Sequence, residues 1–224
     1  MIPLPPGEAG ASFAQLSALL LKRRSVLNFQ HRPVPAELLE QVLAAVSTAP
    51  MGIPPSDVEV LVLENKAAVQ RFTADVIAYL QKISWLFSDL TLRLTRPFMS
   101  AENASMYRDF LAVAIRGILE KHAHGEDWLT YDAPCALYFY TSPFADPADP
   151  IIAATYAMLA AESLGLGSCM VGMIPYCFQY SRSLREKYEV PHKSQGGLMQ
   201  VLGFPSVTYR RGIKRRLGDV RVVA

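Results

Sequence analysis

Two short basic segments lie near opposite ends of a chain whose remaining sequence is apolar and weakly charged. The first is Lys22-Arg23-Arg24-Ser25, and the second is Arg210-Arg211-Gly212-Ile213-Lys214-Arg215-Arg216. A guanidinium presents two N–H donors in one plane, which match two oxygens of a phosphate. The two segments therefore predict one anion site, closed where the termini meet, with a phosphate monoester as its natural ligand. The alternative is a solvated helix end, where basic residues are favoured in any case.

The composition places the chain among globular proteins. Its 224 residues are 51% hydrophobic and 19% charged, which predicts one large domain over residues 1–224. The formal net charge of +2 is too small to indicate nucleic-acid binding. No apolar run reaches about 18 residues, so no membrane-spanning helix is expected. The first residues do not resemble a signal peptide, and we expect a cytoplasmic protein.

Neither cysteine nor histidine spacing indicates a metal site. Cys135, Cys169 and Cys177 form no CxxC pair, so we expect buried thiols in a reducing compartment and no bound metal. The segment His124-Gly125-Glu126-Asp127 either lines a pocket or forms a turn with solvated charges. No GxGxxG or phosphate-loop pattern is present, which argues against the common dinucleotide and nucleoside-triphosphate folds.

Hydrophobic periodicity predicts an α+β layer fold, because helical and extended patterns alternate along the chain. The residues after Asn65, a candidate helix cap, are mostly helical and are interrupted by Pro97; their aromatic rings either pack in a core or interface or cover a pocket. The 151–164 helix is apolar on nearly every face, which indicates burial in the core or at a subunit interface. The expected helices cover 12–24, 36–47, 66–121, 151–164 and 181–188, and the expected strands cover 58–63, 136–140, 168–174 and 198–203, with 220–223 as an extended tail.

The order of these motifs resembles the nitroreductase-like flavoprotein family over about 180 residues. That family has an Arg-Arg-Ser motif followed by Phe, Pro-Val and a helix that ends in Ala-Pro. It also has an apolar helix ending in Ala-Glu-Ser-Leu-Gly-Leu-Gly-Ser-Cys and a late Gly-Tyr-Pro-like turn. In this chain the matching residues are Arg23-Arg24-Ser25, Phe29, Pro33-Val34, Ala49-Pro50, Ala161 through Cys169, and Gly203-Phe204-Pro205.

The resemblance implies a nitroreductase-like fold, with a central, mostly antiparallel sheet flanked by helices, in an intertwined homodimer. It implies FMN bound at the subunit interface and hydride transfer from NAD(P)H to a nitroaromatic, a quinone or a similar acceptor. Because the flavin performs the chemistry, we expect no catalytic side chain. The stretch 66–130, which varies most in such families, is expected to cover the pocket and select the substrate.

The resemblance also assigns roles to residues. Arg23 and Ser25 would contact the FMN phosphate and ribityl chain, with Arg24 close by. Lys214 would supply a second phosphate contact, with Arg216 or Arg211 as substitutes, although an exposed basic tail is the alternative. The backbone N–H groups of Val171, Gly172 and Met173 would lie beside the flavin ring. The segment Pro50, Met51, Gly52 and Ile53 would cover the ring from the other subunit.

Three departures from the family pattern leave the activity open. Leu27 stands where many relatives have Arg or Lys against the flavin, so reduction is harder unless Asn28 or another donor substitutes. Pro54 and Val58 replace an Asn and a Trp of the usual loop. This loop resembles that of a branch often fused to a ferredoxin-like domain, which is absent here, so the donor is NAD(P)H, a separate ferredoxin or neither. The alternative functions are a degenerate, non-catalytic dimer that binds flavin or another phosphorylated ligand, and a structural dimer with an empty pocket.

Overall fold

A four-stranded sheet forms the centre of the fold in the computed structural model, which describes residues 4, 6–52, 57–191, 197–213 and 215–223. The strands are ordered β1-β2-β4-β3, and every neighbouring pair is antiparallel. Every residue of β2 is buried, as expected of a central strand. The structure confirms the α+β fold predicted from the sequence and the mostly antiparallel sheet that the resemblance implies. The strands are β1 (Val58–Leu63), β2 (Cys135–Thr141), β3 (Gly167–Val171) and β4 (Leu198–Gly203).

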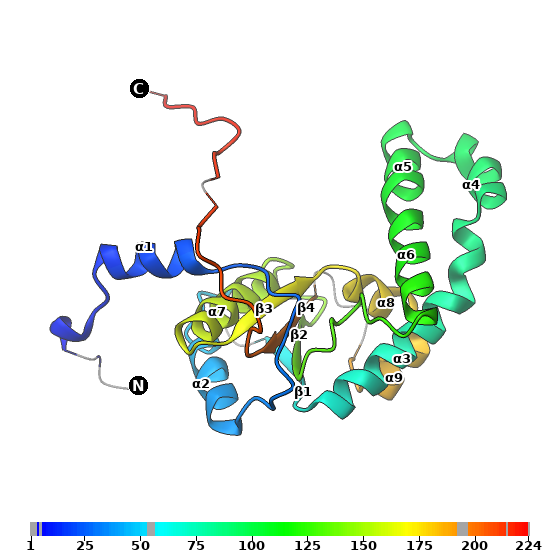
Figure 1. Cartoon of the computed structure of the whole chain (residues 1–224). Helices are drawn as coiled ribbons and strands as arrows, with labels where there is room; N and C mark the ends of the chain where they lie inside the picture. Colours follow the sequence, from blue (N-terminus) through cyan, green and yellow to red (C-terminus); the bar gives the residue numbers. More distant parts are fainter. Residues whose placement is uncertain (1–3, 5, 53–56, 192–196, 214, 224) are drawn as a thin grey trace.

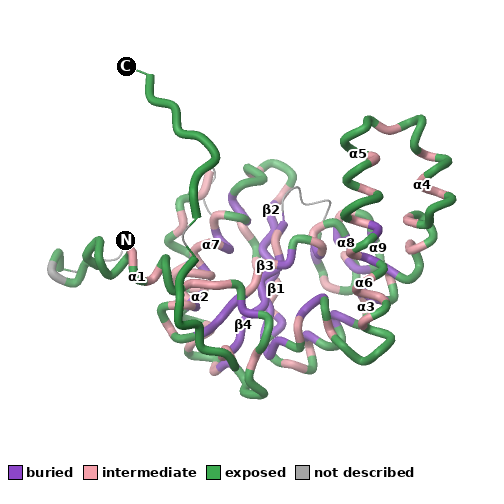
Figure 2. Tube along the Cα trace, turned by 45° about the horizontal axis from the view of Figure 1, so that its top comes forward, coloured by how far each residue is buried: buried purple, intermediate pink, exposed green. Residues whose placement is uncertain are grey.

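Helices cover both faces of this sheet (Figure 1). On one face α2 and α7 pack Val42 and Ala157 against Leu137, and on the other α3 and α8 pack Phe72 and Phe178 against Tyr138. Figure 2 shows the buried residues concentrated along the strands and the helix faces turned toward them. The helices that form the body around the sheet are α2 (Ala36–Val46), α3 (Lys66–Ile83), α7 (Asp149–Ser163), α8 (Ile174–Tyr180) and α9 (Arg182–Lys187). The first helix, α1 (Phe13–Lys22), extends away from the sheet and contacts α7, and a short 3₁₀ turn, η1 (Gly7–Ala9), precedes it (Figure 1).

Local signals account for several helix ends. Ser12 and Gln15 form a capping box at the start of α1. The Asn65 side chain accepts a hydrogen bond from the Ala68 N–H at 2.9 Å, so the predicted cap of α3 is confirmed. The expected strand 168–174 ends earlier, at Val171, because α8 begins at Ile174 with a proline in its first turn. The sequence did not indicate α8, and no strand forms in the described residues after Gly203.

A helical arm, residues 84–123, stands away from the sheet (Figure 1). Its predicted helical character is confirmed, with breaks in the regular helix on both sides of Pro97. Of the rings expected to pack or to cover a pocket, Phe87 stacks on Tyr107 with centroids 6.3 Å apart, whereas Trp85 and Phe98 are exposed. The arm consists of η2 (Ser84–Phe87), α4 (Asp89–Thr95), η3 (Arg96–Phe98), α5 (Ala101–Ser105), a π-helical segment η4 (Met106–Leu111) and α6 (Ala112–Ala123).

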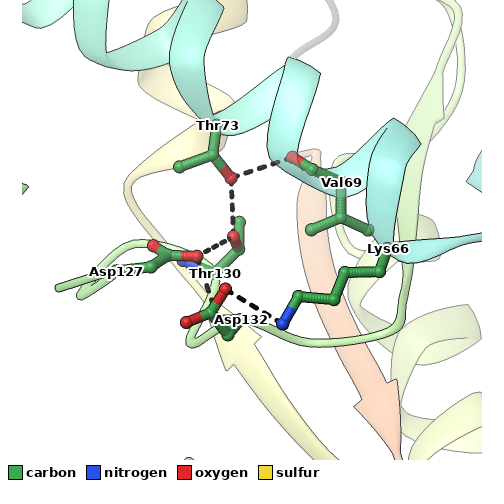
Figure 3. Close-up of polar contacts among 6 residues, drawn as sticks. All are labelled: Lys66, Val69, Thr73, Asp127, Thr130 and Asp132. Atoms are coloured by element: carbon green, nitrogen blue, oxygen red, sulfur yellow. Dashed lines mark hydrogen bonds and ion pairs between the residues drawn. The ribbon is translucent and has the colours of Figure 1, made fainter. Parts of the chain in front are cut away.

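The connection from the arm into β2 is a turn held by Asp127 (Figure 3). Asp127 accepts hydrogen bonds from the N–H groups of Leu129 and Thr130, at 2.9 and 2.8 Å, and from the Thr130 hydroxyl at 2.5 Å. The Thr130 hydroxyl lies 2.6 Å from that of Thr73 on α3. Of the two alternatives for residues 124–127, the structure supports the turn, but the Asp127 charge is bonded to the backbone rather than solvated.

α7 buries only one side within a single chain. Its alanines at 153, 154, 157 and 161 face the sheet, whereas Ile151 is exposed. The expectation of burial on all sides is therefore not met inside one protomer, and a subunit interface is the alternative that remains.

Candidate functional site

The two basic segments meet, as their sequence predicts. The Arg24 guanidinium lies 4.6 Å from the centre of the Tyr209 ring and donates a hydrogen bond to the Arg211 carbonyl at 3.1 Å. These contacts hold the C-terminal segment against the end of α1. A hollow of about 300 Å³ lies between them. We call it the basic hollow; it is lined by Leu20, Leu21, Arg23, Arg24, Ser25, Ile213 and Arg215.

The two neighbouring arginines have different environments. Both are half-buried, but Arg24 binds the C-terminal segment, whereas Arg23 directs one N–H toward the Met158 sulfur of α7, 3.5 Å away. Thioether sulfur is a weak acceptor, and a guanidinium has five N–H donors. Arg23 is therefore well placed to donate to an anion in the hollow.

The segment that carries the arginines runs along the sheet edge. Ser25 bridges to Ser168 of β3 in parallel, and the Val26 N–H donates to the Ser168 carbonyl at 3.0 Å. The approach is close because Gly167 has no side chain: a Cβ there would lie 2.6 Å from Val26 Cγ2. The Arg-Arg-Ser segment is thus fixed by backbone contacts to an edge strand.

A buried glutamine beneath the site was missed by the sequence reasoning. Gln200 of β4 is 0% exposed. With its amide oriented to satisfy its neighbours, its nitrogen donates to the Ala154 carbonyl at 3.2 Å, and its oxygen accepts from the Ser168 hydroxyl at 3.0 Å and the Met158 N–H at 3.2 Å. It thereby links the β3 residue that pairs with Ser25 to the helix residue that contacts Arg23. A single amide in the apolar run Leu-Met-Gln-Val-Leu was the available signal.

The predicted flavin-facing backbone lies at the other end of β3. Val171 is buried, Gly172 is exposed and Met173 is half-buried. A Cβ at Gly172 would meet nothing within 4 Å. Four residues of strand separate Ser168 from Gly172, which corresponds to about 13 Å. Because β3 is an edge strand, the basic hollow and Gly172 mark the two ends of an elongated path rather than a compact anion site.

The predicted covering segment is anchored elsewhere on α7. The Gly52 N–H donates to both carboxylate oxygens of Asp149, at 3.1 and 3.0 Å, and Asp149 is only 4% exposed. Pro50 is exposed, Met51 is half-buried and Ile53 lies outside the described residues. Nine residues of helix separate Asp149 from Met158, about 14 Å. Within one chain, the segment and Arg23 therefore contact α7 about 14 Å apart along its axis.

The C-terminal basic residues divide by position. Arg215 lines the basic hollow, and Arg216 is exposed and not part of its lining. Arg211 contributes its carbonyl to Arg24. Lys214, the first choice from the sequence, lies outside the described residues. Arg215 is thus the cation that the structure brings to Arg23, and the sequence offered no means of selecting it among its neighbours.

The cysteines are unsuited to nucleophilic chemistry. Burial raises the pKa of the Cys135 and Cys177 thiols to about 12. Cys169 is half-buried, and burial raises its pKa more than a hydrogen bond with Ser25 lowers it. Among the described residues, no group of three His, Cys, Asp or Glu side chains is arranged to hold a metal ion, and no helix is long and apolar enough to span a bilayer.

The fold and the site together define an α+β protein with a phosphate-sized basic hollow at a sheet edge, and comparison with known proteins identifies its family. The model of the Nitroreductase family matches residues 20–204. The chain therefore belongs to the nitroreductase family. No curated protein matches its sequence.

Solved structures share the fold at low identity. A nitroreductase with bound FMN from Desulfitobacterium hafniense DCB-2 is 21% identical with a TM-score of 0.65, over 92% of this chain and 97% of that chain. A nitroreductase with bound FMN from Bacteroides fragilis NCTC 9343 is 18% identical with a TM-score of 0.67, over 94% and 99%. An FMN-dependent nitroreductase from Clostridium difficile R20291 is 18% identical with a TM-score of 0.63, over 93% and 99%.

Proposed function

We propose that this chain is an FMN-dependent oxidoreductase that passes a hydride from NAD(P)H or another donor to a nitroaromatic, a quinone or a similar small acceptor. The observation that carries the proposal is the basic hollow at one end of the edge strand β3, with the exposed Gly172 backbone at the other end. Bound FMN would supply the redox chemistry. A cytoplasmic location is part of the same proposal.

The residues present fit a phosphorylated, elongated cofactor. Arg23 and Arg215 offer charged donors to a phosphate, and the Ser25 hydroxyl offers a third. Beyond the Ser25–Ser168 pairing, the edge of β3 leads to Gly172, where the absence of a side chain lets a flat ring approach the backbone N–H. The protein would bind, orient and shield the ring, and no side-chain acid or base is required of it.

The functional unit in this proposal is a homodimer. α1 has no buried residue, although it carries large apolar side chains, of which Phe13 is 84% exposed. Exposed apolar area of this kind marks interaction surfaces. In a dimer, the segment Pro50–Gly52 of one subunit would cover the site of the other, and the arm would help to select the acceptor. Analytical ultracentrifugation should give twice the mass of one chain, and Phe13→Lys should lower it to one chain and weaken FMN binding.

A second candidate is a non-catalytic dimer that binds flavin or another phosphorylated ligand. The observation that favours it is Leu27, which is 42% exposed at the position where many relatives carry a cation. An apolar side chain there cannot stabilise negative charge on a reduced ring.

The visible spectrum of the protein with FMN tests both candidates. Flavin that is bound and then bleached by NADPH or reduced ferredoxin under argon supports the oxidoreductase and identifies the donor class. Flavin that is bound and remains yellow with both donors supports the binder. Arg23→Gln should weaken FMN binding at least tenfold, and Arg182→Gln, an exposed control on α9, should leave it unchanged. Failure to bind FMN would overturn the cofactor assignment.

A further inference from the structure

We propose that the helical arm carries a separate anion site, which binds the phosphate groups of a phosphorylated ligand. The site is a cavity of about 300 Å³ lined by residues of α4, η3, α5 and η4. Figure 1 shows α4 and α5 in the outer part of the arm. Three arginines from three segments line the cavity: Arg93 of α4, Arg96 of η3 and Arg108 of η4. We call it the arm hollow. None of its lining residues belongs to the basic hollow.

The charge in the arm hollow is unbalanced. Its only acidic lining residue is Asp89, which is exposed and lies 3.7 Å from Arg116 on the neighbouring helix. Arg108 is paired with Asp109, and Asp89 lies beside Arg116, so the excess positive charge at the cavity comes from Arg93 and Arg96. The dipole of α4 explains a basic residue in its last turn, Arg93, but not Arg108 on a different helix. Arg93, Arg96 and Arg108 are all exposed, so solvent screens their mutual repulsion, and a bound anion would reduce it further.

Hydrogen bonds within the arm hold the Arg108 guanidinium in one orientation. Its Nε and Nη2 donate to the Asp109 carboxylate at 2.7 and 2.9 Å, and Ser105 donates to the same carboxylate at 2.9 Å. These bonds lower the pKa of Asp109 to about 2, so the pair stays ionised at every physiological pH. The paired guanidinium keeps Nη1 for another acceptor.

The helix type supplies an independent observation. Arg108 and Asp109 lie in a π-helical segment of six residues, Met106–Leu111. π-helical segments make up well under 1% of residues and occur frequently at functional sites. A wider turn rotates the residues on one side of it relative to those on the other, so this segment sets the direction of Arg108 relative to α6. Local departures from regular structure are expected at functional sites, and this one lies at a charged cavity.

Size and chemistry define the ligand group. The cavity accommodates a phosphate or pyrophosphate but not a whole dinucleotide, and arginine forks match phosphate oxygens. Such a group comes either from a 2′-phosphorylated nicotinamide donor or from a phosphorylated acceptor. The anion site itself does not depend on the proposed oxidoreductase activity, whereas the link to the donor rests on it.

Calorimetric titration with inorganic pyrophosphate tests the site. The protein is first saturated with FMN, and the titration is repeated in an R23Q/R215Q background, so that the basic hollow does not contribute. We expect binding in both backgrounds, weakened at least tenfold by R93Q/R96Q and also by R108Q alone. The control R71Q/R182Q, which removes two exposed charges elsewhere, should change the affinity less than twofold.

Absence of pyrophosphate binding by the parent proteins, or equal affinity in R93Q/R96Q and the control, would overturn the proposal. Far-UV circular dichroism shows whether each variant keeps the helical arm. Adenosine 2′,5′-bisphosphate and AMP then separate the two sources. A loss that R93Q/R96Q causes only for the bisphosphate assigns the site to the donor, and equal behaviour of the two nucleotides assigns it to a phosphorylated acceptor. FMN absorbance reports the proposed function separately from these heats.

Discussion

The close contact between Gly167 and Val26 predicts that a side chain added at Gly167 destabilises the fold and that a smaller residue at position 26 reduces this cost. A Cβ added at Gly167 would lie 2.6 Å from Val26 Cγ2 and 2.9 Å from Val26 Cβ. Val26 is buried, and its N–H is bonded to the Ser168 carbonyl at 3.0 Å. Val26 therefore cannot retreat without moving the neighbouring Ser25.

The sizes of the effects follow from this packing. Gly167→Ala should lower the free energy of unfolding by about 1–3 kcal/mol, as overpacking does, which corresponds to about 2–4 °C in Tm per kcal/mol at this chain length. Val26→Ala removes both γ carbons and should cost about 1–3 kcal/mol by itself. In that background the contacts with the two γ carbons are gone but the 2.9 Å contact with Cβ remains, so Gly167→Ala should still destabilise the protein, by about 1–2 kcal/mol less than in the wild type. The coupling between the two sites is therefore about 1–2 kcal/mol.

Urea unfolding of the four proteins measures the coupling, and FMN titration of the same proteins measures its effect on the site. Gly167→Ala should weaken FMN binding, and Val26→Ala should restore part of the loss when the two are combined. Gly117→Ala, in an arm helix where the added Cβ meets nothing within 4 Å, is the matched control and should stabilise the protein by up to about 1 kcal/mol. A cost of Gly167→Ala that is the same in both backgrounds would refute the reasoning.

Three further predictions concern polar groups, two of them buried and one partly exposed. Gln200→Leu should lower the free energy of unfolding by about 1–3 kcal/mol in urea, because its buried partners lose their hydrogen bonds, and FMN affinity should fall with it; unchanged values of both would contradict the role of the amide. Asp149→Ala should cost a similar ~1–3 kcal/mol because the Gly52 N–H loses its acceptor, and Asp149→Glu tests whether the position tolerates a longer carboxylate. Partial burial tends to raise the pKa of Asp75, but hydrogen bonds from Lys187 and a tyrosine outweigh it and leave the pKa below its usual value. Asp75 therefore stabilises the fold above about pH 4, the unfolded pKa, and this contribution is lost as the pH falls through the lower folded pKa, so the difference in Tm between wild type and Asp75→Asn should shrink on acidification.

The strands could be predicted because their signals are local. β1 and β4 match the expected ranges 58–63 and 198–203, since each is an apolar run bounded by turn residues. α8 could not, because Met173 and Ile174 continue the apolar run of β3 and read as more strand. The proline at the next position was the only local sign of a helix start.

Most of the candidate site depends on contacts between distant parts of the chain. Arg23, Arg24 and Ser25 could be selected by type and spacing. The approach of the C-terminal segment could be predicted because both basic segments suit the same anion. The partners could not be selected: Met158 is 135 residues from Arg23, and Gly52 is 97 residues from Asp149. The same limit applies to the arm hollow, where Arg96 and Arg108 meet only because the chain reverses between α4 and α5.

The basic hollow also couples ligand binding to the position of the C-terminal segment. Arg23 contacts Met158 in the body of the fold, whereas Arg215 reaches the hollow only when the C-terminal segment that begins at Tyr209 lies against the end of α1. Arg24 holds that segment through Tyr209 and the Arg211 carbonyl. An anion bound by both Arg23 and Arg215 must stabilise the docked segment by its own binding free energy, by linkage. Loss of Arg24 should therefore lower the affinity for an anion even if Arg24 does not contact it, because part of the binding free energy would then be used to dock the segment.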